Sequence, residues 1–383
     1  MFWRKKKVNN NFLWVIPRVS QVLADAPQNT SSASGETSPE VITSLLAQCG
    51  ISAICVDATA GNSVVTYSFN LKNLKDFSKV KKASEAISAR LGKSVIFEKS
   101  ILPGADFSLA VERSERTTLH FKNAMLSKHA YSNKRTPTAC ILGADTQGNT
   151  LAVDIAKLPH LLIAGATGSG KSVQLHSIIS SILLNAAPSE VKFLMVDVKM
   201  IELPRYNGIA HMMQPVITDA AQAVDMLARV CLLMDERYAK MAQNPSVKFP
   251  HIIVIVDELS DLMMLSKKSV EDSIVRLSQK ARAANINLIL ATQSPRASVL
   301  TGLIRSNIPA RIGLATSTAI DSRICIERNG CESLLGKGDG FFIDPAKGGS
   351  LQRFQAAYIS DSQVDSICSW WRDESRCKEY QTV

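Results

Sequence analysis

The sequence of 383 residues predicts an α/β protein built on a mostly parallel, doubly wound sheet, preceded by a small α/β subdomain. The main observation is a series of nearly continuous apolar segments that alternate with helical stretches from about Ala139 onward. Strands that crossover helices bury on both faces have this composition. A glycine-rich turn directly follows the first segment, where a doubly wound sheet binds its ligand. The five segments are residues 161–164, 191–196, 252–256, 288–291 and 311–314.

Residues 1–39 are expected to form a basic N-terminal arm and a flexible linker. Residues 4–7 are all basic, and the apolar run 12–16 that follows is too short for a signal peptide or a membrane span. Residues 25–39 are small and polar and cannot bury enough apolar surface to order themselves. We therefore expect a loosely ordered segment, with contact to DNA, to a recruiting protein or to a membrane surface as the alternative. No segment of the sequence predicts a transmembrane helix.

Residues 40–155 predict the small α/β subdomain. Residues 64–71 alternate between apolar and polar side chains, as a half-buried strand does. Residues 77–91 have the pattern of a basic amphipathic helix that ends at Gly92, and their lysines fit a solvated face better than a nucleic-acid contact. The other expected elements are a helix over 40–49 and strands over 95–97 and 107–111.

Residues 165–172 match the phosphate-binding P-loop pattern at every fixed position, which are Gly165, Gly170, Lys171 and Ser172. A triphosphate needs several backbone N–H donors, and only a glycine-rich turn lets the main chain wrap that closely. The helix that begins after the turn directs its positive dipole end at the same phosphates. Lys171 would neutralise β- and γ-phosphate charge, and the Ser172 hydroxyl would bind Mg²⁺. The expected nucleotide-binding residues are Gly165, Ala166, Thr167, Gly168, Ser169, Gly170, Lys171, Ser172 and Val173.

Two acidic residues, Asp257 and Glu258, end the apolar strand 252–256. A carboxylate at this edge of the sheet can hold Mg²⁺ through its water shell, and a second one can polarise an attacking water molecule. We assign Asp257 to the metal and Glu258 to the water. The sequence therefore predicts ATP hydrolysis with Mg²⁺ as the cofactor.

Two further residues have two interpretations each. Gln293 ends the strand 288–291 and either senses the γ-phosphate through a hydrogen bond or caps the strand. Arg282 precedes this strand and is either a solvated helix residue or, in a ring-forming ATPase, an arginine finger for a neighbouring subunit.

Composition limits the class of protein. The net charge of +10 fits an anionic partner such as nucleic acid, although a generally basic surface would give the same value. None of the eight cysteines forms a C-x-x-C pair, which argues against a zinc ribbon or a secreted disulfide framework. We expect reduced thiols and a cytoplasmic location.

Taken together, these motifs resemble those of the FtsK/SpoIIIE family of double-stranded DNA translocases. The resemblance covers roughly residues 40–371, and several of its motifs are specific to that family rather than to P-loop proteins in general. The matching motifs are residues 160–172, 196–203, 256–264, 279–284, 291–293, 301–309, 320–323, 333–336 and 338–339.

The resemblance implies a homohexameric ring that moves along duplex DNA by hydrolysing ATP. Residues 40–155 would be the family's α subdomain, residues 156–371 its RecA-like P-loop ATPase domain, and residues 372–383 a C-terminal tail. Lys171, Ser172, Asp257 and Glu258 would be the Walker A and Walker B residues. By the same resemblance Arg282 matches the arginine finger acting in trans, Gln293 the γ-phosphate sensor, and Arg305 a channel lysine that contacts the DNA backbone.

Some positions depart from the family pattern. Ser294 stands where the family usually has a channel arginine, for which Arg296 is the nearest replacement, and Ala319 stands where a lysine is usual. These changes predict a different or weaker grip on DNA. We also expect a motor core without membrane helices or a C-terminal winged helix, serving DNA transfer or genome packaging by a mobile element, plasmid or virus. The resemblance then implies the cytoplasm of a bacterial cell, or of the host of a bacterial virus or mobile element.

Two alternatives are compatible with the sequence. One is a conjugation or secretion coupling ATPase that acts on single-stranded DNA or protein, against which the family-specific motifs argue. The other is a non-hydrolytic DNA-binding assembly protein. That alternative requires a damaged site, whereas Lys171, Ser172, Asp257, Glu258 and Arg282 are all present.

Overall fold

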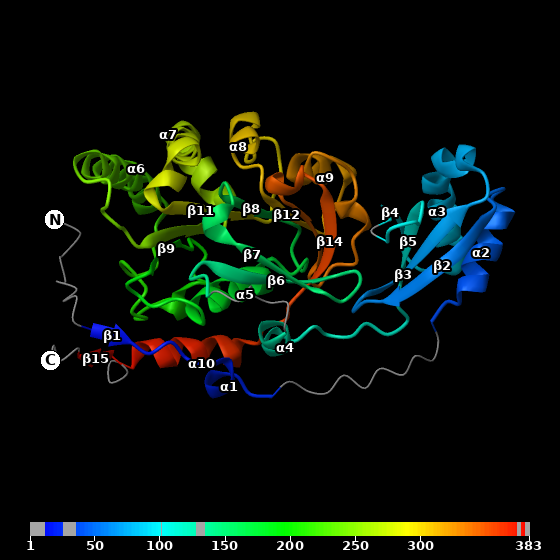
Figure 1. The fold of residues 1–383 in the computed structure, drawn as a ribbon. Coiled ribbons are helices and arrows are strands. Elements are labelled where there is room, and N and C mark those ends of the chain that lie inside the picture. The colour runs from blue at the N-terminus through cyan, green and yellow to red at the C-terminus, as the bar shows by residue number, and fades with distance from the viewer. Residues whose placement is uncertain (1–11, 26–35, 101, 128–134, 374–376, 380–383) are drawn as a thin grey trace.

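The computed structural model describes residues 12–25, 36–100, 102–127, 135–373 and 377–379 (Figure 1). The basic residues 4–7 and most of the expected linker lie outside these ranges. The described chain forms a nine-stranded sheet, a four-stranded sheet, and a pair of short strands, β1 (Phe12–Trp14) and β15 (Cys377–Glu379). The last pair brings residues near the two ends of the chain side by side.

All five predicted strands are present in the larger sheet, where they lie in the order β12-β8-β11-β10-β9 and pair in parallel. Their carboxyl ends meet at one edge, since Thr292 is opposite Ala164 and Val256 is opposite Val196. The strands are β8 (Leu161–Ala164), β9 (Val191–Val196), β10 (His251–Val256), β11 (Ile286–Thr292) and β12 (Arg311–Leu314).

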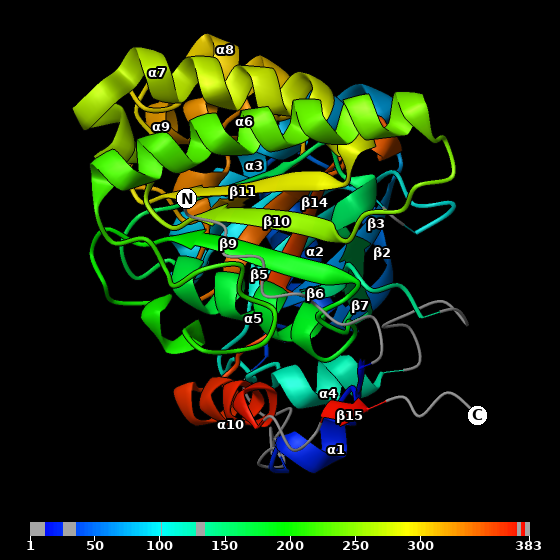
Figure 2. The same cartoon turned by 90° about the vertical axis from the view of Figure 1, so that its left-hand side faces the viewer.

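Helices cover both faces of this sheet, as the unbroken apolar strands predict (Figures 1 and 2). Successive residues of β10 point to opposite faces, so Ile253 and Ile255 enter one core while Ile252 and Val254 enter the other. One face carries α5 (Lys171–Leu183), α10 (Asp361–Arg372), α4 (Phe121–Leu126) and the short α1 (Val19–Val22). The opposite face carries α6 (Ala220–Gln243), α7 (Leu259–Lys280), α8 (Gly302–Asn307) and α9 (Ala319–Ile326).

An antiparallel extension on β12 was not predicted. It adds β13 (Asp339–Ile343), β14 (Leu351–Ala356), β6 (Ala139–Asp145) and β7 (Thr150–Asp154). We assigned residues 139–154 to the small subdomain, but the structure pairs them with the larger sheet. The physical reason is close packing of β6 on β14, where a Cβ on Gly143 would lie 1.9 Å from the carbonyl oxygen of Gln355.

The smaller sheet has the order β2-β3-β5-β4 and is antiparallel throughout. As predicted, Val65, Tyr67 and Phe69 point together into its core, under the two helices of this subdomain. The elements are α2 (Pro39–Gln48), β2 (Ala53–Ala60), β3 (Val64–Leu71), α3 (Phe77–Leu91), β4 (Val95–Lys99) and β5 (Phe107–Glu112). The subdomain lies beside the antiparallel extension (Figure 1).

Among the described helices, none is both long enough and apolar enough to cross a membrane.

Candidate active site

The P-loop follows β8 at the centre of the parallel strands. The Gly165 N–H donates to the Thr292 carbonyl of β11, and the Ala166 N–H donates to the Ala315 carbonyl after β12. Gly170 has a φ of 102°, and a Cβ there would lie 2.5 Å from the Gly338 nitrogen. Only glycine fits this position, because the left-handed backbone and the close approach both exclude a side chain. The loop then opens into α5, whose first turn carries Lys171 and Ser172.

Lys171 and Asp257 form a buried ion pair across the ends of β8 and β10. The Lys171 Nζ is 2.6 Å from Asp257 Oδ1 and also donates to the Asp257 carbonyl oxygen at 2.7 Å. Burial raises the pKa of the Asp257 carboxyl, and the Lys171 ammonium opposes that rise. The two residues predicted for phosphate and metal therefore lie in direct contact.

Glu258 lies beside this pair, and its carboxylate accepts hydrogen bonds on both oxygens. Oε1 accepts from the Thr292 hydroxyl at 2.6 Å and from the Ser260 hydroxyl at 2.8 Å, while Oε2 accepts from the Gln293 N–H at 3.0 Å. Burial alone would raise the pKa of Glu258, but these hydrogen bonds outweigh burial and leave the pKa below its ordinary value. Glu258 is therefore ionised at neutral pH.

The Gln293 side chain points at the P-loop. Its Oε1 accepts a hydrogen bond from the Thr167 hydroxyl at 2.9 Å, and its backbone N–H donates to Glu258. Gln293 therefore connects the phosphate-binding turn to the acidic residue predicted to act on water.

The loop after β9 contributes residues that we did not predict. Asp197 accepts hydrogen bonds from three successive N–H groups of this loop and so fixes its course. Lys199 Nζ lies 3.7 Å from Glu258 Oε2. Glu202 accepts from His176 at 3.1 Å, and that hydrogen bond, with a weaker one from Ser172, lowers the pKa of Glu202 to about 2.

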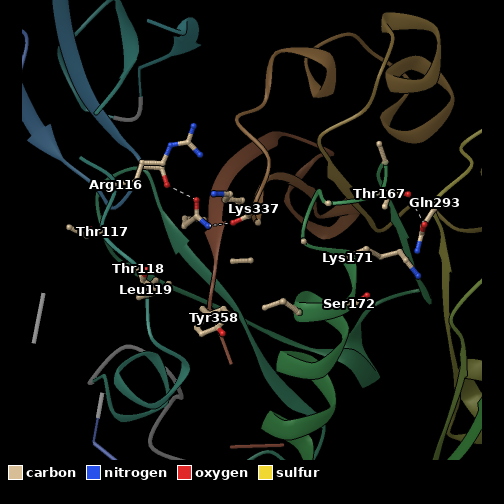
Figure 3. A pocket seen from close by; sticks show the side chains of 18 residues that line it. Arg116, Thr117, Thr118, Leu119, Thr167, Lys171, Ser172, Gln293, Lys337 and Tyr358 are labelled. Carbon is tan, nitrogen blue, oxygen red and sulfur yellow. Dashed lines mark hydrogen bonds between the residues drawn. The ribbon is translucent and has the colours of Figure 1, made fainter. Parts of the chain in front are cut away.

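A cavity of about 490 Å³ extends from the P-loop toward the small subdomain (Figure 3). Lys171 and Ser172 line one side, and the segment Arg116 to Leu119 lines the other, with Lys337 and Tyr358 between them. The cavity is large enough to hold the sugar and base of a nucleotide whose phosphates rest on the P-loop. Nothing in the sequence pointed to its far wall, since residues 116–119 and 355–358 carry no motif.

The donors near Ser172 suit a hard divalent cation. Within the described residues, no cluster of three or more histidine, cysteine, aspartate and glutamate side chains could hold a metal ion by itself. A Ser172 hydroxyl and an Asp257 carboxylate are nevertheless what Mg²⁺ takes from protein, with phosphate oxygens and water completing its shell. The residues present therefore fit Mg²⁺ bound together with a nucleotide.

Arg282 lies far from the P-loop of its own chain. It belongs to a 3₁₀ turn (Ala281–Ala284) before β11, whereas the P-loop touches the other end of that strand. The seven residues of β11 separate the two by about 20 Å. The exposed Arg282 side chain donates to the Ala156 carbonyl at 3.3 Å.

The two residues predicted to contact DNA follow β11 on the side of α8. Arg296 is exposed in the loop that begins at Gln293, and Arg305 lies part-buried on α8. Ser294 lies at the start of the same loop. The structure therefore places Arg296 three residues from the sensor position, on one continuous segment.

Comparison with known proteins agrees with the motifs. Residues 123–247 and 242–297 match the FtsK/SpoIIIE family. The DNA translocase FtsK of Clostridium acetobutylicum is 37% identical over 362 residues, which cover 90% of this chain and 47% of that protein. The DNA translocase SftA of Bacillus subtilis is 37% identical over 381 residues, which cover 94% of this chain and 40% of that protein. The chain thus spans less than half the length of each of these two relatives. The predicted resemblance to the family is confirmed.

Solved structures share the fold. The pCW3 conjugation coupling protein TcpA, solved in a monomer form with ATPγS, superposes with a TM-score of 0.58 at 21% identity, over 85% of this chain and 97% of that one. The cytoplasmic domain of the Thermomonospora curvata type VII secretion ATPase EccC gives a TM-score of 0.54 at 24% identity, over 62% of this chain and 31% of that one. The predicted RecA-like α/β fold with a P-loop is confirmed by this likeness.

Proposed function

From this relationship to the FtsK/SpoIIIE family, we propose that the chain is an ATPase that moves double-stranded DNA. The observation that carries the proposal is the meeting of Lys171, Asp257, Glu258 and Gln293 at the carboxyl ends of neighbouring parallel strands. Phosphoryl transfer needs a cation for the phosphates, a ligand for Mg²⁺, a group that acts on water and a sensor of the γ-phosphate. Each of these four tasks has a residue of suitable chemistry here.

In this proposal the backbone N–H groups of residues 166–173 and the Lys171 ammonium hold the triphosphate. Lys171 exchanges its hydrogen bonds to Asp257 for bonds to phosphate oxygens, which frees the Asp257 carboxylate for the metal. Ser172 and Asp257 would hold Mg²⁺, which would supply positive charge to neutralise the phosphates. Glu258 orients the attacking water, and the cavity between the P-loop and residues 116–119 takes the base and sugar.

We further propose that the active unit is a homohexameric ring in the cytoplasm. The support is the position of Arg282, which is exposed but lies about 20 Å from the P-loop of its own chain. An arginine finger at that position can reach only the nucleotide of a neighbouring subunit. The mass of the complex formed with ATP and a duplex of known length, measured by light scattering, should be that of six chains plus one duplex.

Duplex DNA is the proposed substrate, and Arg296 and Arg305 are its proposed phosphate contacts. Two observations support this assignment. Both arginines lie on the segment that continues from Gln293, and the chain has a net charge of +10. This segment would carry a change at the γ-phosphate sensor to the DNA.

The test is the rate of ATP hydrolysis with no DNA, with single-stranded DNA and with linear duplex DNA. Duplex DNA should raise the rate severalfold, and Lys171→Ala and Glu258→Gln should each abolish turnover. Arg296→Ala should lower the response to duplex DNA, whereas Lys81→Ala on the exposed face of α3 is the matched control and should leave it unchanged.

Other outcomes assign the site differently. Stimulation by single-stranded DNA alone would favour a coupling ATPase over a duplex translocase. Turnover that survives Glu258→Gln would show that another group acts on water. ATP binding without any hydrolysis would favour an assembly protein.

A further inference from the structure

The carboxylate of Glu258 is held by hydrogen bonds on both oxygens, most of them on Oε1. Oε1 accepts from Thr292, from the Ser260 hydroxyl and, at 3.3 Å, from the Ser260 N–H, so that Glu258 serves as the N-cap of α7. Oε2 accepts from the Gln293 N–H and lies 3.7 Å from the Lys199 ammonium. The side chain of Glu258 is 3% exposed. A base must present a lone pair within hydrogen-bond reach of its proton. Oε1 has no lone pair left for water, and the remaining lone pair of Oε2 belongs to a side chain that is almost fully buried, so Glu258 is held out of contact with water in this arrangement.

The shortest of these bonds comes from Thr292, the last residue of β11. Thr292 is fully buried, and its hydroxyl also accepts a hydrogen bond from the Ser294 N–H at 3.0 Å. Its carbonyl accepts the N–H of Gly165, the first residue of the P-loop. Thr292 therefore contacts the acidic residue, the phosphate-binding turn and the segment that leads to Arg296.

Thr292 therefore lies between the site of ATP hydrolysis and the segment proposed to contact DNA. The turn at Thr292 and Gln293 touches Glu258 on one side and Thr167 of the P-loop on the other. The next residues, from Ser294 to Arg296, enter the segment proposed to contact DNA. A pull on this segment moves the Ser294 N–H, which is bonded to the same hydroxyl that holds Glu258.

We propose that Thr292 is a positioning residue that holds Glu258 away from water until DNA contact shifts the segment after β11. The inference rests on the proposed function, since it assigns to Thr292 the control of a reaction that Glu258 performs. It predicts that the DNA response depends on a hydroxyl that touches neither nucleotide nor DNA.

Thr292→Val tests this, because valine keeps the shape of threonine and removes only the hydroxyl. Hydrolysis without DNA should rise about tenfold, since a hydrogen bond to a charged group shifts a two-state equilibrium by at least about that factor. The rate with saturating duplex DNA should change by less than about twofold, so the stimulation ratio falls. The KM for ATP should stay near that of the parent, because Thr292 does not line the cavity. Thr292→Ser restores the hydroxyl and should restore the ratio.

Two further variants make the result specific. Ser260→Ala weakens the hold on Glu258 from the α7 side and should also raise the DNA-independent rate, which serves as the test if Thr292→Val does not fold. Thr66→Val makes the same chemical change in β3 of the small subdomain, where the hydroxyl has no hydrogen-bond partner within the described part of the chain, and should leave the ratio unchanged.

A parallel fall of both rates in folded Thr292→Val, or rates equal to those of the parent, would overturn the inference. Its failure is distinct from failure of the proposed function. If Glu258→Gln keeps its turnover, the assignment of Glu258 is wrong. If Glu258→Gln is inactive and Thr292→Val behaves like the parent, the catalytic assignment stands and the restraint by Thr292 does not exist.

Discussion

His211 shows at the scale of one residue how the core constrains protonation. Its ring is fully buried, and Nε2 donates to the Ala186 carbonyl at 2.9 Å. The ring packs edge-on against Trp371, with 4.4 Å between centroids, and Nδ1 has no hydrogen-bond partner among the residues that the structure describes. Burial lowers the pKa of His211 to about 3, because a proton on Nδ1 would place an unpaired charge in the core.

We therefore expect stability to fall in mild acid. The unfolded chain has a histidine pKa near 6.5 and binds a proton between pH 6.5 and 3, whereas folded His211 does not. The contribution is complete above pH 6.5 and decreases by about 1.4 kcal/mol for each pH unit below it. His160, whose pKa burial lowers to about 4, acts in the same direction.

Urea unfolding at pH 7, 6 and 5 measures this dependence. His211→Gln keeps a side-chain donor for Ala186 and removes the titration, so the slope between pH 6 and 5 should decrease by about one proton. A slope equal to that of the parent chain would show that His211 takes up a proton in the folded state.

Some residues of the site could be predicted from the sequence, and others depend on tertiary contacts. Lys171, Asp257 and Glu258 could be predicted because their type and their distance from a strand end follow from phosphate and metal chemistry. Thr292 and Lys199 could not, because their contacts with Glu258 depend on the register of β10 with β11 and on the course of the loop after β9. Lys199 lies in the motif 196–203, one of those that match the family, but the resemblance assigned no role to Lys199.

At the scale of elements, the P-loop depends on a segment distant in sequence. The Gly338 N–H donates to the Ser169 carbonyl at 2.7 Å, and the Gly170 Cα lies against this contact. Residues 335–338 therefore support the turn from outside, directly before β13. The phosphate-binding element is a pair of loops rather than one.

Gly170→Ala should break this pair. A Cβ at Gly170 would overlap the Gly338 backbone at 2.5 Å and would add left-handed strain, so we expect a loss of about 2–5 kcal/mol in unfolding free energy and at least tenfold weaker ATP binding. Gly168→Ala is the matched control, since Gly168 has a φ of 78° and an added Cβ would have no atom of the described residues within 4 Å. It should cost only the strain of about 1–2 kcal/mol. Equal losses of stability would show that the contact with Gly338 does not matter.

The elements themselves were predictable to different degrees. The parallel strands were found because burial on both faces leaves a continuous apolar run in the sequence. The antiparallel extension was missed because its pairing is non-local: Phe354 of β14 pairs with Asp145 of β6, more than two hundred residues earlier. Such a pairing leaves no periodicity within either strand.

At the scale of the whole molecule, the two sheets meet at a buried cluster of charges. Arg353 of β14 makes two hydrogen bonds to Asp339 of β13, at 2.8 and 3.0 Å. Its third nitrogen lies 3.8 Å from Glu98 of β4, in the small subdomain. Arg353 thus connects β4 of the small subdomain to β13, the strand that directly follows the segment packed on the P-loop. This contact was not predictable, because each of the three residues alone resembles a solvated charge.

This cluster should make a measurable contribution to stability. Arg353→Met leaves Asp339 and Glu98 buried without their cation and should cost about 3–5 kcal/mol in urea unfolding. Glu98→Gln, which removes only the more distant partner, should cost much less, because the bidentate pair with Asp339 stays intact. The triple variant Arg353→Met, Asp339→Asn, Glu98→Gln removes the charges together and should recover part of the stability lost by Arg353→Met.

If the triple variant is less stable than Arg353→Met alone, the cost comes from packing of the arginine stem and not from unpaired buried charge. If Glu98→Gln costs as much as Arg353→Met, then the contact between the sheets, rather than the pair within β13 and β14, holds the small subdomain against the ATPase domain.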